Sequence, residues 1–474
     1  MMACCARPSI ALLCKGLLLV EAVALLALLS PASVSFPYGH MLALLVYVLV
    51  AYVPVIFVCS WLRRQSVGMV SLCFFVLAAL VSLHYIYISN DSAYTNDMPG
   101  HLARVQFITD HWLAPYEYKG WQQHHPPLYY HLAAAVYWLT DQFFVAVNPL
   151  TSLRFFSWMC YLLFNAYSLL TLRRAGFSGI IYYSSLALLL LWPAGFHVAS
   201  KISPEPLYYA LYAASFYHAL CWYQEGRQGV LRRAVVLAGL ALTVRTGAVV
   251  LCAVIAALVL IRLFQRRVYI RDFLSKYWLA VWAILALCLA INMGRIILYG
   301  YPLSEHLVSF KRTPFPLSHY LSLHFDYTLT HPFNDFTHNQ SFWDFFLKTA
   351  IFGEYRWTSP QLASALIFVA MLVVFYTALP WLFARRAEWR ELLPYLLGAL
   401  IPLLFLIVFS VRAPHFSTQD ARFVYPSLVC FTVFFGKSQE FYQARRALAL
   451  RVLGPLLAGF FTILAIIFFW CNAR

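Results

Sequence analysis

The chain of 474 residues is 62% hydrophobic and only 11% charged, and it carries a formal net charge of +16. Soluble domains contain roughly 25% charged residues, so this composition excludes a soluble globular protein and indicates a polytopic membrane protein. In such a chain the excess positive charge meets anionic lipid, and nucleic acid is excluded as a partner. The apolar runs follow one another without low-complexity linkers, which predicts one integral membrane domain, residues 1–474.

The first apolar runs predict a hairpin of two helices at the amino terminus, residues 1–66. The run from about residue 9 to residue 30 is longer than the apolar core of a signal peptide and lacks a convincing cleavage site, so we expect it to be retained. The other predicted parts are, in chain order, a helical module (67–300) with a first outer loop (about 89–151), a second outer loop (301–359) and C-terminal helices (360–474).

Six pairs of arginines abut the apolar runs, and they predict which side of the membrane each loop faces. Short cytoplasmic loops carry an excess of arginine and lysine. We therefore place all six pairs inside. The pairs are Arg63/Arg64, Arg173/Arg174, Arg232/Arg233, Arg266/Arg267, Arg385/Arg386 and Arg445/Arg446.

This placement requires an even number of crossings between Arg64 and Arg173. The chain offers three apolar stretches there, near 67–88, 126–147 and 152–172. The middle stretch opens with two prolines and carries polar residues along its length, so we expect it to lie in the outer interface as a juxtamembrane helix. Onward from there, the total is about 13 spans of about 20 residues each, with the amino terminus inside. The later crossings are expected near 179–198, 204–222, a short pair around 245–247, 277–299, 360–383, 392–410, 423–440 and 451–471.

With these sides assigned, most carboxylates and nearly all histidines fall on the outer side, where the chain forms two long loops. Loops of this length are uncommon and usually functional. Few charges lie within the spans, chiefly Glu21 and Arg245, whereas a proton-coupled transporter places ionisable groups near the bilayer midplane. Because an unpaired arginine within a span is costly, we expect Arg245 to pair with a carboxylate or a phosphate.

Several different short motifs of polar and aromatic residues lie on the outer side. Asp97 is followed four residues on by His101, and His125 is followed by Pro-Pro-Leu-Tyr-Tyr at 126–130. An acid and histidines held beside aromatic residues at a membrane surface indicate chemistry at that face. The other motifs are Ser203-Pro204-Glu205-Pro206, Arg245-Thr246-Gly247, Phe352-Gly353-Glu354 and Arg422-Phe423-Val424-Tyr425-Pro426.

In this order and on one side, the motifs resemble those of the lipid-linked-sugar (GT-C) glycosyltransferases, in the branch of the protein O-mannosyltransferases and the lipid A aminoarabinose transferase. The resemblance covers the chain from about residue 67 onward and makes 67–300 the catalytic module. It implies an all-α polytopic membrane protein, a bundle of about 13 transmembrane helices whose two long extracytoplasmic loops carry juxtamembrane helices. The chain departs from the family where Met98 replaces a second acid after Asp97, and where two spans precede the family's first helix.

The resemblance also implies an inverting transfer of a sugar from a polyprenyl or dolichyl phosphate to a hydroxyl group of a lipid, glycan or protein. A general base is needed for the acceptor, and the predicted catalytic residues are Asp97 and His101. The departing lipid phosphate needs cationic and hydrogen-bonding groups. The candidates for it are His125, Arg422 and Tyr425, with Lys119, Lys201 and Arg245 behind them. The candidates for the acceptor pocket are Glu205, Tyr129, Tyr130 and Glu354.

Each of these residues also has a structural interpretation. Asp97 precedes Met98-Pro99, a favourable helix start, and can serve as its cap. His101 can stabilise Asp97 one helical turn away, and Glu205 can complement a helix dipole. Arg422 can be a positive residue beside a span that sets the orientation of the span, yet it lies on the side of the membrane where such residues are not expected. Asp97 and His101 lack the further ligands of a metal site, so we expect neither a metal ion nor a cofactor besides the lipid-phosphate sugar.

Two other functions stay open at this point. A multi-pass transporter or lipid flippase needs no covalent chemistry, although the sequence shows no clear internal repeat of the kind such proteins contain. A membrane scaffold leaves the outward bias of the carboxylates unexplained. For the location, a bacterial inner membrane is the first interpretation and the endoplasmic reticulum is the alternative, which sequons at Asn90 and Asn339 would suit. Mannose, glucose, galactose and aminopentoses all remain candidate sugars.

Overall fold

The computed structural model describes most of the chain from Tyr52 onward, and its residues from Val53 belong to one compact unit. The predicted amino-terminal hairpin therefore lies almost wholly outside the described residues, as do Lys119 and Glu354. The described residues are 52–89, 97–112, 122, 125–143, 147–265, 278–279, 281–286, 288, 290, 315–333, 340–353, 355, 357–383, 386–445 and 447–472.

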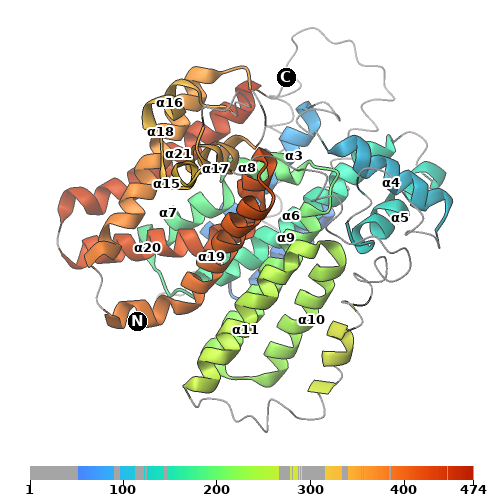
Figure 1. The fold of residues 1–474 in the computed structure, drawn as a ribbon, viewed down its shortest axis with the longest axis horizontal. Helices are drawn as coiled ribbons and strands as arrows, with labels where there is room; N and C mark the ends of the chain where they lie inside the picture. Colours follow the sequence, from blue (N-terminus) through green and yellow to red (C-terminus); the bar gives the residue numbers. More distant parts are fainter. Residues whose placement is uncertain are drawn as a thin grey trace, which may run out of the picture. The chain divides into compact units, whose positions relative to one another are not determined.

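Over these residues the secondary structure is helical, and no strand occurs among them (Figure 1). The α-helices are α3 (Met69–Ile88), α4 (Met98–Asp110), α5 (Leu128–Phe143), α6 (Pro149–Arg173), α7 (Gly179–Leu190), α8 (Pro193–Ala199), α9 (Glu205–Glu225), α10 (Gln228–Val244), α11 (Val249–Phe264), α15 (Leu317–Leu321), α16 (Phe325–Thr330), α17 (Phe342–Phe352), α18 (Pro360–Ala378), α19 (Arg386–Arg412), α20 (Leu428–Ala444) and α21 (Leu448–Asn472). The 3₁₀ helices are η1 (Thr246–Ala248), η2 (Leu379–Phe383), η3 (Phe416–Gln419), η4 (Ala421–Phe423) and η5 (Tyr425–Ser427).

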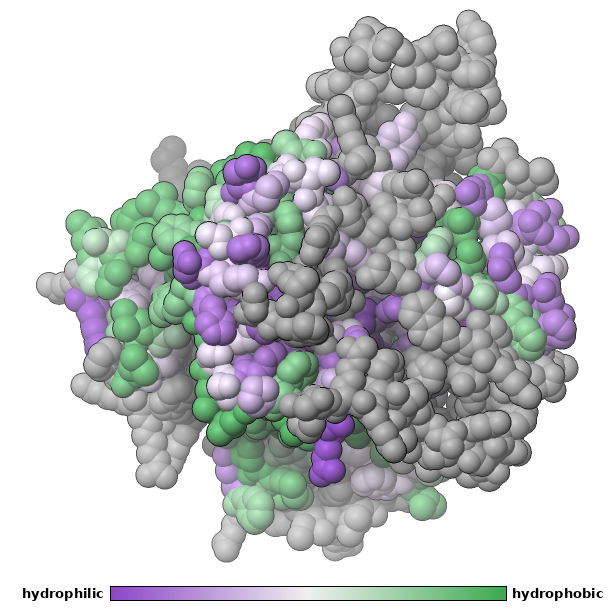
Figure 2. All heavy atoms as spheres, turned by 45° about the horizontal axis from the view of Figure 1, so that its top comes forward, coloured by the Kyte–Doolittle hydropathy of each residue, from purple (hydrophilic) through white to green (hydrophobic). Residues whose placement is uncertain are grey.

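Six helical segments in the described part of the chain are long and apolar enough to cross a membrane, and the bent pair α7–α8 raises the number to seven if it is one span. The six include α3, α6, α11 with η1, α18, the greater part of α19, and α21. Several of them expose large apolar side chains, such as Phe375, Leu404 and Phe460. Figure 2 shows apolar side chains, in green, over much of the described surface on one face. The all-α polytopic class is confirmed, whereas the count of about 13 spans is not.

Two predicted crossings, near 204–222 and 423–440, correspond to α9 and α20, which are not among these six segments. The reason lies in their packing. α9 packs closely against both α6 and α10, and it buries residues on every side, including Tyr208, Tyr209 and Tyr212. A helix enclosed by other helices does not face lipid, so its sequence tolerates polar groups that an exposed span would exclude.

The contacts at the two ends of α6 and α9 show that Arg173 and Arg174 lie at the opposite end of these helices from Lys201. At the C-terminal ends, Arg174 forms an ion pair with Glu225 at 2.5 Å, and Arg173 donates a hydrogen bond to the carbonyl of Gln65. Near the N-terminal ends, the hydroxyl of Ser157 on α6 donates to the carbonyl of Lys201, just before α9. Lys201, which is predicted to lie outside, is thus separated from Arg173 and Arg174 by the length of a helix.

Helices α4 and α5 lie side by side (Figure 1), and Arg104 ties them to the segment between them. Its guanidinium lies 4.0 Å from the centre of the Tyr130 ring. It also donates hydrogen bonds to the carbonyls of Gln122 (2.8 Å) and His125 (2.7 Å). With 16 residues, α5 is shorter than the roughly 20 residues that a span requires. Its position in the outer interface stays a prediction.

The described part of the second outer loop forms α15, α16 and α17, and Asp344 connects α16 to α17. The Asp344 carboxylate accepts hydrogen bonds from the backbone and side chain of Ser341 in a capping box, and from His324 and Thr328. Although burial opposes the charge, these hydrogen bonds hold the pKa of the Asp344 carboxyl below its ordinary value. α17 is thereby fixed, and its Thr349 hydroxyl accepts from the Ala421 amide (3.0 Å), which anchors η4.

Candidate functional site

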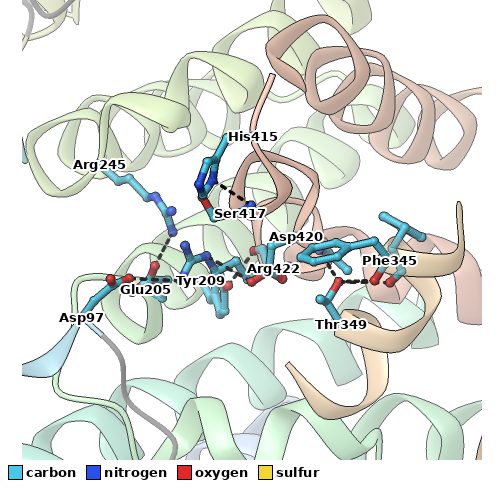
Figure 3. Close-up of polar contacts among 12 residues, drawn as sticks. Asp97, Glu205, Tyr209, Arg245, Phe345, Thr349, His415, Ser417, Asp420 and Arg422 are labelled. Atoms are coloured by element: carbon cyan, nitrogen blue, oxygen red, sulfur yellow. Dashed lines mark hydrogen bonds and ion pairs between the residues drawn. The ribbon is translucent and has the colours of Figure 1, made fainter. Parts of the chain in front are cut away.

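Three carboxylates and two arginines from separate parts of the chain meet in one cluster (Figure 3). Asp97 directly precedes α4, Glu205 begins α9, Arg245 lies between α10 and η1, and Asp420 and Arg422 lie between α19 and α20. Nη1 of Arg422 lies 3.2 Å from Oδ2 of Asp97, and its Nε lies 3.3 Å from Oδ2 of Asp420. Nη1 of Arg245 lies 2.9 Å from Oε1 of Glu205. Figure 3 shows Arg422 between Asp97 and Asp420.

Arg422 is held in place through its backbone as well as its side chain. Its amide donates a 2.8 Å hydrogen bond to the Asp420 side chain, which caps η4, and its carbonyl accepts one of 2.6 Å from the Tyr209 hydroxyl. The Arg422 side chain is 16% exposed and that of Asp420 is 3% exposed. Burial raises the pKa of the Asp420 carboxyl, although the positive charges of Arg422 and Lys201 act against this.

Asp97 occupies the predicted N-cap position of α4, but its side chain makes no capping hydrogen bond. The carboxylate contacts Arg422 instead, 325 residues away in the sequence. Its side chain remains 34% exposed, twice the fraction for Arg422. Asp97 therefore has a fixed cation on one side and access to solvent on the other, which a helix cap does not require and a general base does.

His101 lies one turn after Asp97 but is buried, with 2% of its surface exposed. Its Nδ1 is 2.8 Å from the Tyr130 hydroxyl. Burial lowers the pKa of His101 from 6.5 to about 4, against the negative charges of Glu205 and Asp97, which raise it. His101 is therefore neutral at physiological pH, and its ring is held by the hydrogen bond with Tyr130.

The burial of His101 leads to a pH-dependent stability. Between pH 6.5 and about 4 the unfolded chain binds a proton at this histidine that the folded protein does not. We expect the free energy of unfolding to be highest above pH 6.5. On acidification, the protonation of this histidine should lower it by roughly 3 kcal/mol. Denaturant unfolding in detergent between about pH 4 and pH 7 measures this pH dependence. In the variant His101→Gln, the free energy of unfolding should change less with pH. An unchanged pH dependence in that variant contradicts the assignment.

A small pocket lies beside Arg422, with a cavity volume of about 10 Å³ and an opening to solvent. Of the predicted phosphate-binding residues it brings together Lys201, Arg422 and Tyr425, and it adds His197 and Asp420. Its walls come from α8, α17 and the segment between α19 and α20. Two cations and one carboxylate thus line a cavity that touches the partner of Asp97.

The pocket exists because α7 and α8 are bent by 43° relative to one another. Pro193 begins α8, and a residue that precedes proline is disfavoured in the helical region. Trp192 is accordingly extended, and its indole N–H donates to the Ala350 carbonyl on α17 at 2.6 Å. On α8, Gly195 lies so close to Tyr425 that a Cβ there would be 2.6 Å from the tyrosine hydroxyl. Any larger residue at 195 would displace both Tyr161, which is closer still, and Tyr425.

The other predicted residues that the structure describes do not line the pocket. His125 lies beside His101, with ring centres 5.6 Å apart, and Tyr129 and Tyr130 are buried between α4, α5 and α6. Glu205 and Arg245 face one another. The side chains of this pair are 8% and 7% exposed, and the Arg245 guanidinium lies 4.9 Å from the Phe423 ring. The expectation that Arg245 pairs with a carboxylate is confirmed.

Because this ion pair is buried, removing one partner should be more damaging than removing both. Arg245→Met leaves the Glu205 carboxylate without its cation, and we expect the free energy of unfolding to fall by about 3–5 kcal/mol. The double variant Glu205→Gln/Arg245→Met should recover most of this loss. Denaturant unfolding of the two variants in detergent measures the difference. A double variant as unstable as Arg245→Met would show that the pair is not the source of the stability.

Sequence reasoning did not select His197 or Asp420. His197 lies in an apolar run that was predicted to be one span, and only the bend before Pro193 brings it to the pocket. The available signal was that proline, which indicates a break in a helix. Asp420 stands two residues before Arg422, and an Asp preceding a short helix is a frequent cap. Capping here also places the carboxylate against the arginine.

No family model matches the chain, and no curated protein matches it. Among solved structures the chain is similar to GT-C glycosyltransferases. One is the oligosaccharyltransferase of Archaeoglobus fulgidus in the apo form (TM-score 0.48, 16% identity). The match covers 85% of this chain and 55% of that one. Another is ArnT from Cupriavidus metallidurans bound to undecaprenyl phosphate (TM-score 0.34, 14% identity, 77% of this chain and 76% of that one). A third is the arabinosyltransferase EmbB from Mycobacterium smegmatis (TM-score 0.42, 13% identity, 86% and 41%).

This chain thus spans little more than half the length of the archaeal oligosaccharyltransferase and less than half that of EmbB. With identities of 13 to 16% and TM-scores below 0.5, the likeness transfers neither activity nor substrate to this chain. Its function has to follow from its own residues.

Proposed function

We propose that this chain is an inverting glycosyltransferase that moves a sugar from a polyprenyl- or dolichyl-phosphate carrier to a hydroxyl group of a lipid, glycan or protein. The observation that carries the proposal is the contact between Asp97 and Arg422, 3.2 Å. Asp97 is a partly exposed carboxylate, and Arg422 lines a pocket together with Lys201. A base and a phosphate site joined by one side chain are what such a transfer requires.

In the proposed reaction the acceptor oxygen attacks the anomeric carbon from the face opposite the phosphate. Asp97 takes the proton of the acceptor hydroxyl. The bond between the anomeric carbon and the phosphate oxygen breaks, and its electron pair stays on the phosphate. Arg422 and Lys201 stabilise the charge that develops there, and the planar guanidinium suits a phosphate because it donates two parallel hydrogen bonds. No step uses a metal ion or a cofactor besides the donor.

The proposed side of the reaction is extracytoplasmic or lumenal. The site lies at the helix ends opposite the arginine pairs Arg63/Arg64 and Arg173/Arg174, and short loops rich in arginine face the cytoplasm. The protein is a multi-pass membrane protein. Within the proposal, a bacterial inner membrane and the endoplasmic reticulum both provide lipid-phosphate sugars.

The test is a transfer assay with the purified protein in lipid nanodiscs. Radiolabelled polyprenyl-phosphate-linked mannose, glucose, galactose and aminopentose are supplied as donors, with lipid, glycan and peptide acceptors. We expect transfer from at least one donor with inversion at the anomeric carbon. If no donor supports transfer, while the protein in liposomes moves the intact lipid-linked sugar between leaflets, the transporter or flippase alternative takes its place.

A further inference from the structure

His197 is a buried histidine in the wall of the pocket, and the reaction described above does not use it. It lies on α8 and is 3% exposed. Neither of its ring nitrogens has a hydrogen-bond partner in the structure. Buried polar side chains are nearly always hydrogen-bonded, and an unsatisfied one costs about 1–3 kcal/mol. The site therefore keeps a hydrogen-bonding group ready for something that enters the pocket.

The position of the His197 ring is tightly constrained by the residues on its other side. Its ring meets that of Tyr355 edge to face, with centres 5.8 Å apart. Gly353 approaches it so closely that a Cβ would lie 2.9 Å from Nε2. Gly353 also has φ of +68°, a conformation that favours glycine. Because residue 353 is a glycine, it adopts this backbone conformation and has no side chain that would collide with the imidazole.

Burial disfavours a positive charge on the His197 ring, and the neighbouring cations add to this effect. Lys201 and Arg422 both act electrostatically on His197, and both line the same pocket. Two cations oppose a third positive charge on the ring. A neutral imidazole offers one N–H donor and one acceptor nitrogen, so it adds a hydrogen bond to a bound anion without adding charge.

We propose that His197 binds the phosphate group of the lipid carrier, donating its ring N–H to a non-bridging phosphate oxygen beside Lys201 and Arg422. This inference rests on the proposed function for the identity of the ligand. The geometry assigns the contact by the three groups that meet in the pocket: a lysine, an arginine and a neutral imidazole with an unused donor. The hydrogen bond persists as the phosphate departs, so it favours both the bound donor and the leaving group.

The contact can be tested by binding rather than by transfer, using farnesyl phosphate as the probe and farnesol as the uncharged reference. Isothermal titration of the full chain in detergent should detect farnesyl phosphate binding to the wild type. His197→Phe keeps a ring of similar shape but removes both nitrogens, and we expect a roughly 10- to 100-fold weaker affinity. His197→Gln supplies an N–H near the position of Nε2 and should retain most of the affinity. Farnesol binding should not change in any variant.

A matched control is His218→Phe, because His218 is a half-buried histidine on α9 that packs on Tyr167 and Tyr217 away from the pocket. It should bind farnesyl phosphate like the wild type. If His197→Phe does not fold, His197→Leu is the second variant without hydrogen-bonding groups. A wild type that does not bind farnesyl phosphate, or a His197→Phe variant that binds it normally, overturns the inference. If binding depends on His197 but the protein shows no transferase activity, the phosphate site is supported and the proposed reaction is rejected.

Discussion

Asp97→Asn is expected to lower the rate of sugar transfer by roughly 10²- to 10⁴-fold, the range that a general base contributes. Asparagine has nearly the same shape and can still accept a hydrogen bond from Arg422, but it cannot take a proton from the acceptor. The loss should therefore appear in kcat, while binding of farnesyl phosphate stays close to that of the wild type. Steady-state transfer rates at saturating donor, measured beside the binding titration, separate the two effects.

Asp110→Asn is the matched control for this substitution, because Asp110 is an exposed aspartate at the other end of α4. It should transfer sugar at the wild-type rate. If Asp97→Asn also transfers at that rate, Asp97 is not the base. If both variants lose transfer together with their thermal stability, the effect comes from α4 as a whole.

Arg422→Gln is expected to affect both halves of the site. The departing phosphate loses a charged donor, which should lower kcat/KM for the lipid-phosphate sugar by roughly 10²- to 10³-fold. Asp420, 2% exposed, loses its ion-pair partner. Burial already raises the pKa of its carboxyl, so without Arg422 we expect it to take up a proton. The resulting loss of stability should be smaller than for an unpaired buried charge, which costs about 3–5 kcal/mol.

The structural and catalytic parts of this prediction can be separated with the double variant Asp420→Asn/Arg422→Gln. It removes both charges and should recover stability in denaturant unfolding, while transfer stays low. Arg412→Gln, an exposed arginine at the end of α19, serves as the control and should behave like the wild type in both measurements. Recovery of transfer in the double variant would show that Arg422 acts only by neutralising Asp420.

The sequence was informative where a residue contradicted a simple expectation. Arg422 was selected because it carries positive charge on the side where none is needed for topology, and the structure places it at the centre of the cluster. Asp97 was selected from a local motif. That the two touch was beyond prediction from local patterns, because 325 residues separate them and only the packing of α4 and the segment before α20 brings them together.

Aromatic residues were the least predictable part of the site. Tyr129 and Tyr130 follow two prolines at a helix start, and the same pattern serves an interfacial anchor, a pocket wall or a packing contact equally well. In the structure Tyr130 holds His101 and lies under Arg104. His197 was not predicted because it lies within an apolar run. Only the proline before it indicates the bend that brings it to the pocket.

The contact between Asp97 and Arg422 also has a consequence for how the protein is made. Asp97 and Arg422 are 325 residues apart in the sequence, so the ribosome produces Asp97 long before Arg422. The cluster forms once α19 and α20 have packed against one another. Closing such a long segment is entropically expensive and comes late in folding. During synthesis Asp97 is therefore present without its cation, and the proposed activity requires the assembled bundle rather than an early intermediate of insertion.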